Sequence, residues 1–286
     1  MSGPGPHALH AVSFRMPKVA MTSESRGNPV ALPPIPNLRD VGGCRTRAGR
    51  RVRSGLLYRS SGLHALAATD AAAFAGLGIR TVYDLRMARE QAEAPDRLAP
   101  GTRHVPLDVL AAWTDGGPSR LFALFEDPAS ARGALDNGGA EALWTEQYRA
   151  FVHLPSARSG FGRLFRDLAD EPHRPALVHC TTGKDRTGWA AAALQLLLDV
   201  PEAAVMDHFL ESRLHLGPLV EPALSAFAAR GGDPELLRPI LDVRPVYLEA
   251  ALHEVRSEYG SIEAYFDDGL GVDEATRTVL RAAFVG

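Results

Sequence analysis

Cysteine is scarce in this chain: among 286 residues, only Cys44 and Cys180 carry a thiol. Two thiols are too few for the disulfide framework of a small secreted protein, so we expect a reducing environment. The chain also lacks a large excess of charge of either sign, because it has 31 Lys and Arg residues and 34 Asp and Glu residues, with a net charge of −3. Without the basic excess that drives binding to nucleic acid, we expect no nucleic-acid partner.

Long hydrophobic runs are also missing. The longest apolar stretch, residues 189–198, has about ten residues and is interrupted by Gln195, whereas a membrane-spanning helix needs roughly 20. The first residues lack the continuous apolar core of roughly 7–15 residues that a cleaved signal peptide requires. We expect no transmembrane segment, and a protein that is cytoplasmic or exported without a cleaved signal.

What the chain does contain divides into a short tail and one long domain. Residues 1–34 are rich in Gly, Pro and Ser and follow neither a helical nor a strand period, which predicts a disordered tail. Residues 35–286 are predicted to form one domain. Within it, residues 108–155 hold two aromatic-rich helical stretches around a polar linker, residues 127–139. We predict an inserted lid of two amphipathic helices and a loose linker; ordinary packing helices with a surface loop are the alternative.

Helical and strand patterns alternate along the domain, as judged from apolar periodicity and capping signals. The predicted elements, in order, are a helix that Asp70 can cap and Gly78 can end, a strand at residues 79–85, a helix at residues 160–168, a strand at residues 175–179, an apolar helix at residues 187–198, and helices that start at Asp233 and Asp273. Strands that alternate with helices predict an α/β fold with a central, largely parallel sheet and helices on both faces.

One segment between the second strand and the apolar helix has the residues for chemistry. It runs His179, Cys180, Thr181, Thr182, Gly183, Lys184, Asp185, Arg186, Thr187 and Gly188, so that a cysteine and an arginine flank five residues. A loop that leads into a helix N-terminus presents backbone N–H groups and the positive end of the helix dipole, which bind a tetrahedral anion and favour a thiolate. The guanidinium of Arg186 can hold two phosphate oxygens at once. This pattern predicts a phosphate-binding loop over residues 181–186, with Cys180 as the nucleophile.

The segment resembles the signature of the cysteine-dependent protein tyrosine phosphatases, a histidine and cysteine, five residues, then arginine and Ser or Thr. It is most similar to the bacterial branch related to the mycobacterial secreted tyrosine and lipid phosphatase, which also has three upstream motifs. Here these motifs are Asn37-Leu38-Arg39-Asp40, Tyr58-Arg59-Ser60-Ser61, and Asp84-Leu85-Arg86 with Glu90, in the same order. The resemblance implies a tyrosine-phosphatase-like fold over residues 35–286 and hydrolysis of phosphotyrosine through a phosphocysteine, with no metal or cofactor.

The resemblance also suggests roles for single residues of the loop. Thr187 is expected to donate a hydrogen bond to the sulfur as it leaves the phosphocysteine. No W-P-D tripeptide, the general-acid motif of many tyrosine phosphatases, occurs in the chain. The family favours Asp185 as the proton donor, and Asp108, which follows a strand-like segment, is the competitor. Lys184 is the only lysine besides Lys18, and a lysine retained where arginine is otherwise used suggests that a compact ammonium attracts substrate charge there.

Other functions remain open or are excluded by the same residues. The lysine in the loop also resembles phosphoinositide phosphatases, so a lipid phosphate is an alternative substrate. A phosphate-binding module without catalysis is a further alternative, although the intact Cys180 and Arg186 argue against it. A sulfurtransferase of the rhodanese kind would not need the upstream motifs. His208, Glu211 and His215 have only weak metal-like spacing, and we expect solvated helix positions there rather than a metal site.

Overall fold

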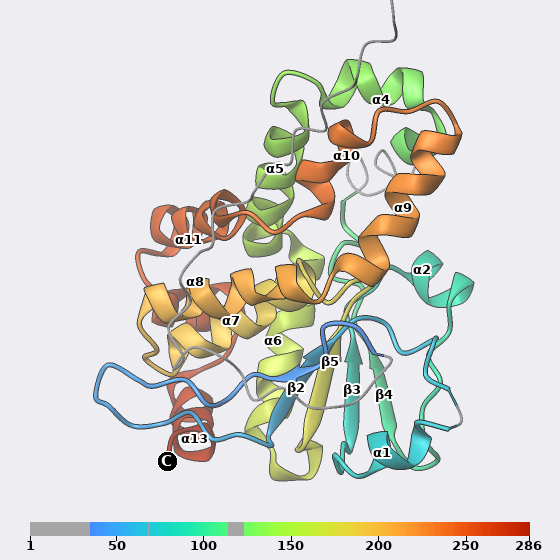
Figure 1. The fold of residues 1–286 in the computed structure, drawn as a ribbon. Coiled ribbons are helices and arrows are strands. Elements are labelled where there is room, and N and C mark those ends of the chain that lie inside the picture. Colours follow the sequence, from blue (N-terminus) through green and yellow to red (C-terminus); the bar gives the residue numbers. More distant parts are fainter. Residues whose placement is uncertain (1–34, 68, 114–122) are drawn as a thin grey trace, which may run out of the picture.

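A computed structural model describes residues 35–67, 69–113 and 123–286 of the chain. These residues contain a five-stranded sheet in the strand order β1-β2-β5-β3-β4, which lies in the lower part of the view in Figure 1. The four longer strands pair in parallel, and only β1 is antiparallel to its neighbour β2. The strands are β1 (Arg39–Asp40), β2 (Leu57–Ser60), β3 (Thr81–Asp84), β4 (Arg103–Pro106) and β5 (Ala176–His179). The predicted α/β fold with a largely parallel sheet is confirmed.

Both faces of the sheet are covered, and all residues of the three central strands β2, β5 and β3 are buried. Val82 and Leu177 belong to a small core together with Phe74 of α1 (Ala71–Ala75). Their neighbours along the strands, Tyr83 and Val178, belong to the large core, because successive side chains of a strand point to opposite faces. The large core also contains the apolar faces of α6, α7 and α13.

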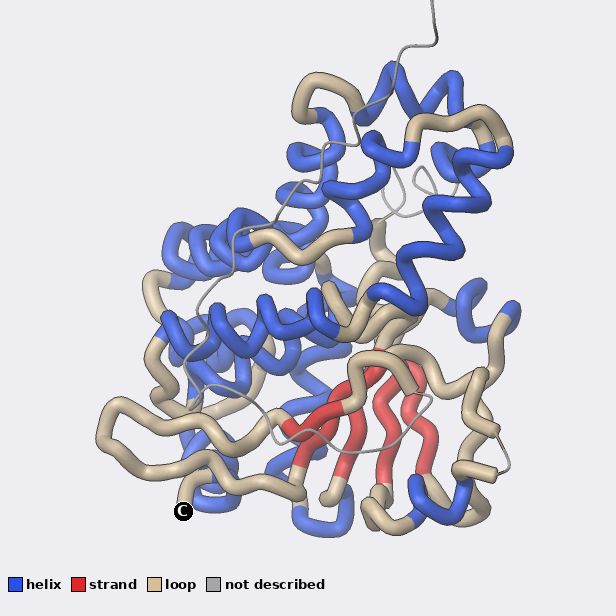
Figure 2. Tube along the Cα trace, viewed as in Figure 1, coloured by secondary structure: helices blue, strands red, loops and turns tan. Residues whose placement is uncertain are grey.

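Helices make up most of the remaining structure, as Figure 2 shows in blue. They are α2 (Ala88–Glu93), α4 (Pro128–Leu135), α5 (Gly139–His153), α6 (Pro155–Ala169), α7 (Arg186–Leu197), α8 (Glu202–Leu210), α9 (Gly217–Ala229), α10 (Pro234–Leu241), α11 (Pro245–Tyr259), α12 (Ile262–Ala264) and α13 (Glu274–Phe284), with short η1 (Glu171–His173), η2 (Glu211–Leu214) and η3 (Tyr265–Gly269). The helix starts predicted at Asp233 and Asp273 are confirmed, since each carboxylate accepts a backbone N–H of the first turn.

The predicted loose linker at residues 127–139 is wrong, because α4 occupies most of it. Asp127 accepts hydrogen bonds from the backbone N–H groups of Ala129 and Ser130, and a proline stands at the first helical position. Leu135 is buried at the other end of the helix. Local capping therefore stabilises a helix in a segment whose composition is typical of a linker.

The region predicted as a lid lies beyond the carboxyl ends of the strands. There α4 and α5 lie near α9 and α10, above the sheet in the view of Figure 1. Residues 123–126 are helical. The first part of the first predicted lid helix falls within residues 114–122, and the predicted tail covers residues 1–34; both lie outside the described residues. In the described part of the chain, no helix is long and apolar enough to cross a membrane.

Candidate active site

The segment from Cys180 to Arg186 forms a loop between β5 and α7, at the carboxyl end of the middle strand of the sheet (Figure 1). Open parallel sheets bind ligands at this edge, and the loop leads into the N-terminus of a helix of 12 residues. Cys180 has a buried side chain, and Arg186 is the first helical residue. The structure thus brings the predicted nucleophile and the predicted phosphate-binding arginine to one loop.

Gly183 determines the path of this loop. Its φ of +68° lies in the left-handed region, and a Cβ atom at this position would lie 2.3 Å from the carbonyl oxygen of Ser60. Only glycine tolerates both the backbone angle and the close approach. Ser60 ends β2 and belongs to the second upstream motif, so this motif provides the surface against which the loop turns.

Two side chains from upstream motifs hold the carbonyl oxygen of Gly183. Asn37 donates from Nδ2 at 2.9 Å, and Arg59 donates from Nη2 at 2.6 Å. Burial lowers the pKa of Arg59 to about 10, although the electrostatic interaction with nearby Cys180 acts in the opposite direction. The first and second motifs therefore shape the loop, and Arg59 adds a buried positive charge near the thiol.

Arg39 connects this support to the end of α8 and to η2, which follows it. Its Nη2 donates to the carbonyl of His208 at 3.0 Å and to Oγ of Ser212 at 2.9 Å, and its Nε lies 3.8 Å from the Glu211 carboxylate. His208 and Glu211 are buried, while His215 is half-buried. The prediction of solvated helix positions is therefore wrong for His208 and Glu211, because the buried guanidinium needs acceptors.

Glu90 from the third upstream motif binds the guanidinium of Arg186. Its Oε2 lies 2.5 Å from Nη1, its Oε1 lies 2.9 Å from Nη2, and the hydroxyl of Thr181 also donates to it. Burial raises the pKa of the Glu90 carboxyl, but the charge and hydrogen bonds of Arg186 outweigh burial and lower it to about 2. The sequence places Glu90 in the third motif but indicates no role for it; in the structure it is the partner that orients the arginine.

The Glu90 ion pair predicts a dependence of stability on acid. The pKa of Glu90 falls from an ordinary 4.5 to about 2 on folding, so the pair stabilises the folded state at neutral pH and this contribution is lost as the pH falls from about 4.5 toward 2. Glu90→Gln should lower the melting temperature at pH 7 by a few degrees and weaken its fall between pH 5 and 3. Melting curves over this range provide the measurement.

Glu93→Gln is the matched control for this prediction. Glu93 pairs with Arg89 at 2.7 Å, but both side chains are more than half exposed. Exposed pairs contribute little to stability, so this variant should melt like the parent at every pH. If Glu90→Gln showed the same pH dependence as the parent, the pair would have no measurable effect on stability.

Asp185 precedes the first residue of α7, and its carboxylate is held by two aromatic side chains of α5 rather than by the backbone of the helix. Its Oδ1 accepts hydrogen bonds from Nε1 of Trp144 at 3.0 Å and from the hydroxyl of Tyr148 at 2.9 Å. Burial and the nearby carboxylate both raise the pKa of Tyr148, which therefore stays a hydrogen-bond donor. Sequence reasoning treated both aromatic residues as apolar packing groups. The indole N–H and the phenol hydroxyl could have indicated polar contacts from the sequence, because buried Trp and Tyr usually find a polar partner.

Lys184 connects the loop to the end of α10. Its Nζ donates to the carbonyl oxygens of Ile240 at 2.8 Å and Asp242 at 2.9 Å, and lies 3.0 Å from Oδ1 of Asp185. The ammonium also lies 5.2 Å from the centre of the Trp144 ring. A compact ammonium suits this crowded position, as the sequence suggests. The attraction of substrate charge by Lys184 stays a prediction.

A cavity of about 160 Å³ lies against the loop. Five loop residues form part of its wall: Thr181, Thr182, Lys184, Asp185 and Arg186. The rest of the wall is mostly apolar and comes from Met87, Glu90, Leu110, Phe125, Trp144, Gln147, Leu219, Val220, Ile240 and Leu241. The wall therefore combines loop groups that can bind an anion with apolar side chains that can pack against a ring.

Two predicted site residues, Asp108 and Thr187, do not line the cavity. The Asp108 carboxylate accepts hydrogen bonds from the backbone N–H groups of Ala88 at 3.0 Å and Leu110 at 3.1 Å, and Asp108 is not among the residues that line the cavity. Its position is that of a cap for α2. Thr187 is buried, and its Oγ1 has no hydrogen-bond partner among the described residues. Its hydrogen bond to the sulfur stays a prediction.

Comparison with known proteins gives matches over nearly the whole chain. A model of the tyrosine phosphatase family matches residues 30–286. A protein of Cupriavidus necator named as a tyrosine-protein phosphatase is 33% identical over 269 residues, 94% of this chain and 93% of that protein. The triple specificity protein phosphatase PtpB of Mycobacterium tuberculosis is 29% identical over 279 residues, 89% of this chain and 98% of that protein. Among solved structures, TpbA of P. aeruginosa covers 67% of this chain and 89% of its own, at a TM-score of 0.32 and 21% identity.

Proposed function

The chain belongs to the tyrosine phosphatase family, and we propose that it hydrolyses phosphotyrosine in proteins through a phosphocysteine intermediate on Cys180. One observation carries this proposal: the loop from Cys180 to Arg186 leads into α7 beside a cavity whose remaining wall is mostly apolar. The loop suits a phosphate, and the apolar wall suits the ring of a tyrosine. A shorter alkyl group, such as that of phosphoserine, would leave this wall uncovered.

In the first step, the thiolate of Cys180 attacks phosphorus, so that a sulfur–phosphorus bond forms as the bond to the tyrosine oxygen breaks. The guanidinium of Arg186 and the N–H groups of the loop stabilise the charge on the phosphoryl oxygens. Glu90 holds the arginine at two of its nitrogens, so the fork meets the phosphate already oriented. Lysine could not replace Arg186, because an ammonium cannot bind two phosphate oxygens in the planar geometry of a guanidinium.

The departing tyrosine oxygen needs a proton, and we assign its transfer to Asp185. The Oδ1 atom is held by Trp144, Tyr148 and Lys184, so we assign the proton transfer to Oδ2. In the second step, the Asp185 carboxylate takes a proton from water, which attacks the phosphocysteine. The sulfur–phosphorus bond breaks, inorganic phosphate leaves, and Cys180 returns to the thiolate.

Initial rates on three substrates test this function. A phosphotyrosine peptide, a phosphoserine peptide of the same sequence and vesicles that contain phosphatidylinositol phosphates are compared side by side, with a chelator present. We expect the phosphotyrosine peptide to have the highest kcat/KM. A higher value for the lipid would instead favour the phosphoinositide alternative, and no turnover of any of the three would favour a phosphate-binding module.

We also propose that the inserted region acts as a lid over the cavity. Phe125 and Trp144 of this region contribute to the wall, together with Leu219 and Val220 of α9. Cys180 is only 1% exposed, so a substrate reaches the sulfur only after some of these side chains move. Such a cover would also keep oxidants from the thiolate.

Deletion of residues 128–139 should therefore expose the thiol. The deletion removes α4, which packs against α5 and α10. In a Cys44→Ser background, oxidation of Cys180 by hydrogen peroxide should become several-fold faster, and KM for an aryl phosphate should change. Mass spectrometry of the sulfur oxidation states measures the first effect, and circular dichroism checks the fold. Equal oxidation rates in the folded deletion variant and its parent would support ordinary packing helices instead of a lid.

A further inference from the structure

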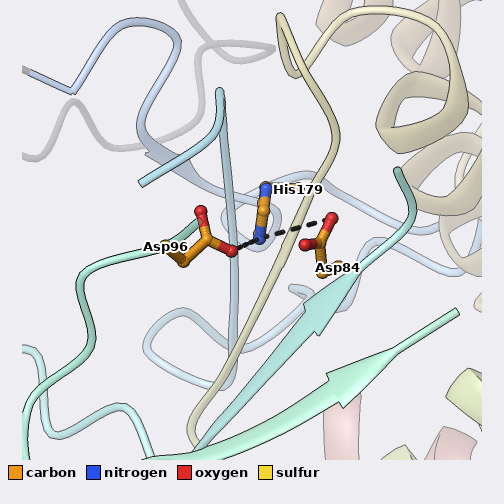
Figure 3. Close-up of side chains that lie close together, drawn as sticks. All are labelled: Asp84, Asp96 and His179. Atoms are coloured by element: carbon orange, nitrogen blue, oxygen red, sulfur yellow. Dashed lines mark ion pairs between the residues drawn. The ribbon is translucent and has the colours of Figure 1, made fainter. Parts of the chain in front are cut away.

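Three residues around the end of β5, drawn in Figure 3, have the spacing of metal ligands. The ligand atoms of Asp84, Asp96 and His179 lie within 4.8 Å of one another, and Nε2 of His179 lies 2.9 Å from Oδ2 of Asp96. However, Nη2 of Arg86 lies 2.7 Å from the carboxylate of Asp84 and 3.0 Å from that of Asp96. A metal ion would have to displace this buried cation, so we assign no metal site to the cluster.

A hairpin at residues 44–53 has one buried side and one side made of arginine. Backbone hydrogen bonds between residues 43–46 and 50–52 hold its two strands together. The side chains of Cys44, Thr46 and Val52 are buried. Apart from two small turn residues, the exposed positions are five arginines, and the hairpin contains no acidic residue. We call these five side chains the arginine face; they are Arg45, Arg47, Arg50, Arg51 and Arg53.

Strand geometry places four of these arginines on the same side of the hairpin. Arg45 and Arg51 stand directly opposite each other across the two strands. Arg47 and Arg53 lie two positions further along the strands, and side chains two positions apart point the same way. In Figure 1 the hairpin extends at the left of the molecule, beside the end of α13 and on the side away from α2. The arginine face is therefore separate from the cavity at the loop, which other residues line.

Carbonyl oxygens hold three of these side chains in place without neutralising their charge. Arg53 donates to a carbonyl in the last turn of α13 at 2.7 Å, Arg50 to the carbonyl that follows α13 at 3.0 Å, and Arg51 to the carbonyl just before the hairpin at 3.1 Å. Within the described residues, these three pair with no carboxylate, whereas Arg47 pairs with Asp199 at 3.3 Å. Since a guanidinium has five N–H groups, the three side chains keep donors for an external anion.

Support of α13 accounts for only part of the arginine face. Carbonyl oxygens at a helix C-terminus favour nearby cations, and Arg50 and Arg53 provide them. Arg47 and Arg51 make their contacts elsewhere, to Asp199 and to the hairpin itself. The chain has 31 Lys and Arg residues, of which the face has five, so the remaining 26 stand against 34 Asp and Glu residues. A hairpin of one charge sign on an otherwise acidic chain is an attractive site for anions.

We propose that the arginine face docks the protein on an anionic membrane surface. Clustered basic residues are attracted to anionic lipids, and a guanidinium fork can bind two phosphate oxygens at once. The face lies on an extended hairpin, while the cavities beside α10, beside α1 and beside the loop are lined by other residues, so it suits a flat surface. A long polyanion such as nucleic acid would be repelled by the acidic remainder of the chain. Docking through this hairpin is independent of the proposed hydrolysis and leaves the cavity at the loop uncovered.

Sedimentation of the full chain with vesicles tests the proposal. Vesicles of phosphatidylcholine alone are compared with vesicles of phosphatidylcholine and phosphatidylglycerol in equal amounts, at physiological salt. We expect binding to the anionic vesicles only, and weaker binding at higher salt because the arginine face is exposed. Equal binding to both vesicles, no binding to either, or tighter binding to a single-stranded oligonucleotide at the same phosphate concentration would overturn the proposal. No turnover is needed, so the result is independent of the phosphatase activity.

Arg47→Gln combined with Arg51→Gln removes two charges of the face and keeps the contacts to α13. A basic residue near an anionic surface contributes about fivefold to binding, so this variant should bind anionic vesicles about 25-fold more weakly. Arg149→Gln combined with Arg163→Gln is the matched control, because both side chains are exposed and each pairs with a carboxylate of its own helix. The control should bind like the parent. Equal weakening in both variants would assign binding to net charge, and unchanged binding in the first would refute docking through the hairpin.

Single variants keep the test decisive if the double variant does not fold. Arg47→Gln and Arg51→Gln should each weaken binding about fivefold, and Arg51→Lys should restore most of the loss because it keeps the charge. Melting curves check that each variant is folded. Unchanged binding in both glutamine variants would contradict the proposal, and so would a loss in Arg51→Lys as large as that in Arg51→Gln.

Discussion

Cys180→Ser is expected to reduce turnover of an aryl phosphate by at least about 10⁴-fold while phosphate still binds, the scale of loss when a nucleophile is removed. A serine hydroxyl is not ionised at neutral pH and cannot form the phosphocysteine. The loop N–H groups, Arg186 and the N-terminus of α7 remain in the variant, so the anion keeps its site. Steady-state rates without added metal measure the first effect, and titration calorimetry with vanadate measures the second.

Cys44→Ser is the control for that experiment. Cys44 is the only other cysteine, it is buried, and its Sγ lies 3.5 Å from Nε2 of Gln195. Burial raises the pKa of its thiol to about 11, so it is not a thiolate at neutral pH. This variant should retain full activity. Undiminished turnover in Cys180→Ser would remove the basis of the proposed mechanism.

The second large effect is expected at Asp185. Asp185→Asn should cost roughly 10²–10⁴ in rate with a phosphotyrosine peptide, the range for a positioned acid. The amide cannot give the departing oxygen its proton. The loss should shrink with a leaving group such as nitrophenolate, which departs without protonation. Rates for a series of aryl phosphates, plotted against the pKa of the leaving phenol, measure this dependence.

Asp108→Asn is the comparison that tests the assignment. The carboxylate of Asp108 accepts the backbone N–H groups of Ala88 and Leu110, and the residue does not line the cavity. We therefore expect a mild loss that is the same for every leaving group, because only the cap of α2 is weakened. A large, leaving-group-dependent loss at Asp108 with little effect at Asp185 would reverse the roles and leave Asp185 as a structural residue of the loop.

Sequence alone was sufficient to predict the parts of the site that are local in the chain. Residues 180–186 contain the proposed nucleophile, the arginine and the N–H groups of the loop, so their spacing alone predicts an anion site before a helix. The α/β fold was predictable for a similar reason, since apolar periods and caps such as Asp233 and Asp273 are read over a few residues. The α4 helix was missed because its stability comes from one cap and one buried face within a polar stretch.

Only the tertiary structure decided which partners the loop residues have. Glu90 on Arg186, Trp144 and Tyr148 on Asp185, and Asp96 on His179 are contacts between segments far apart in the chain. A hydrophobic pattern shows which face of a helix is buried, but not which polar atom its aromatic side chains reach. The spacing of carboxylates along the chain likewise says nothing about which one faces a cation. These pairings depend on how α2, α5 and the segment before β4 pack around the end of β5, and that packing is a property of the folded chain.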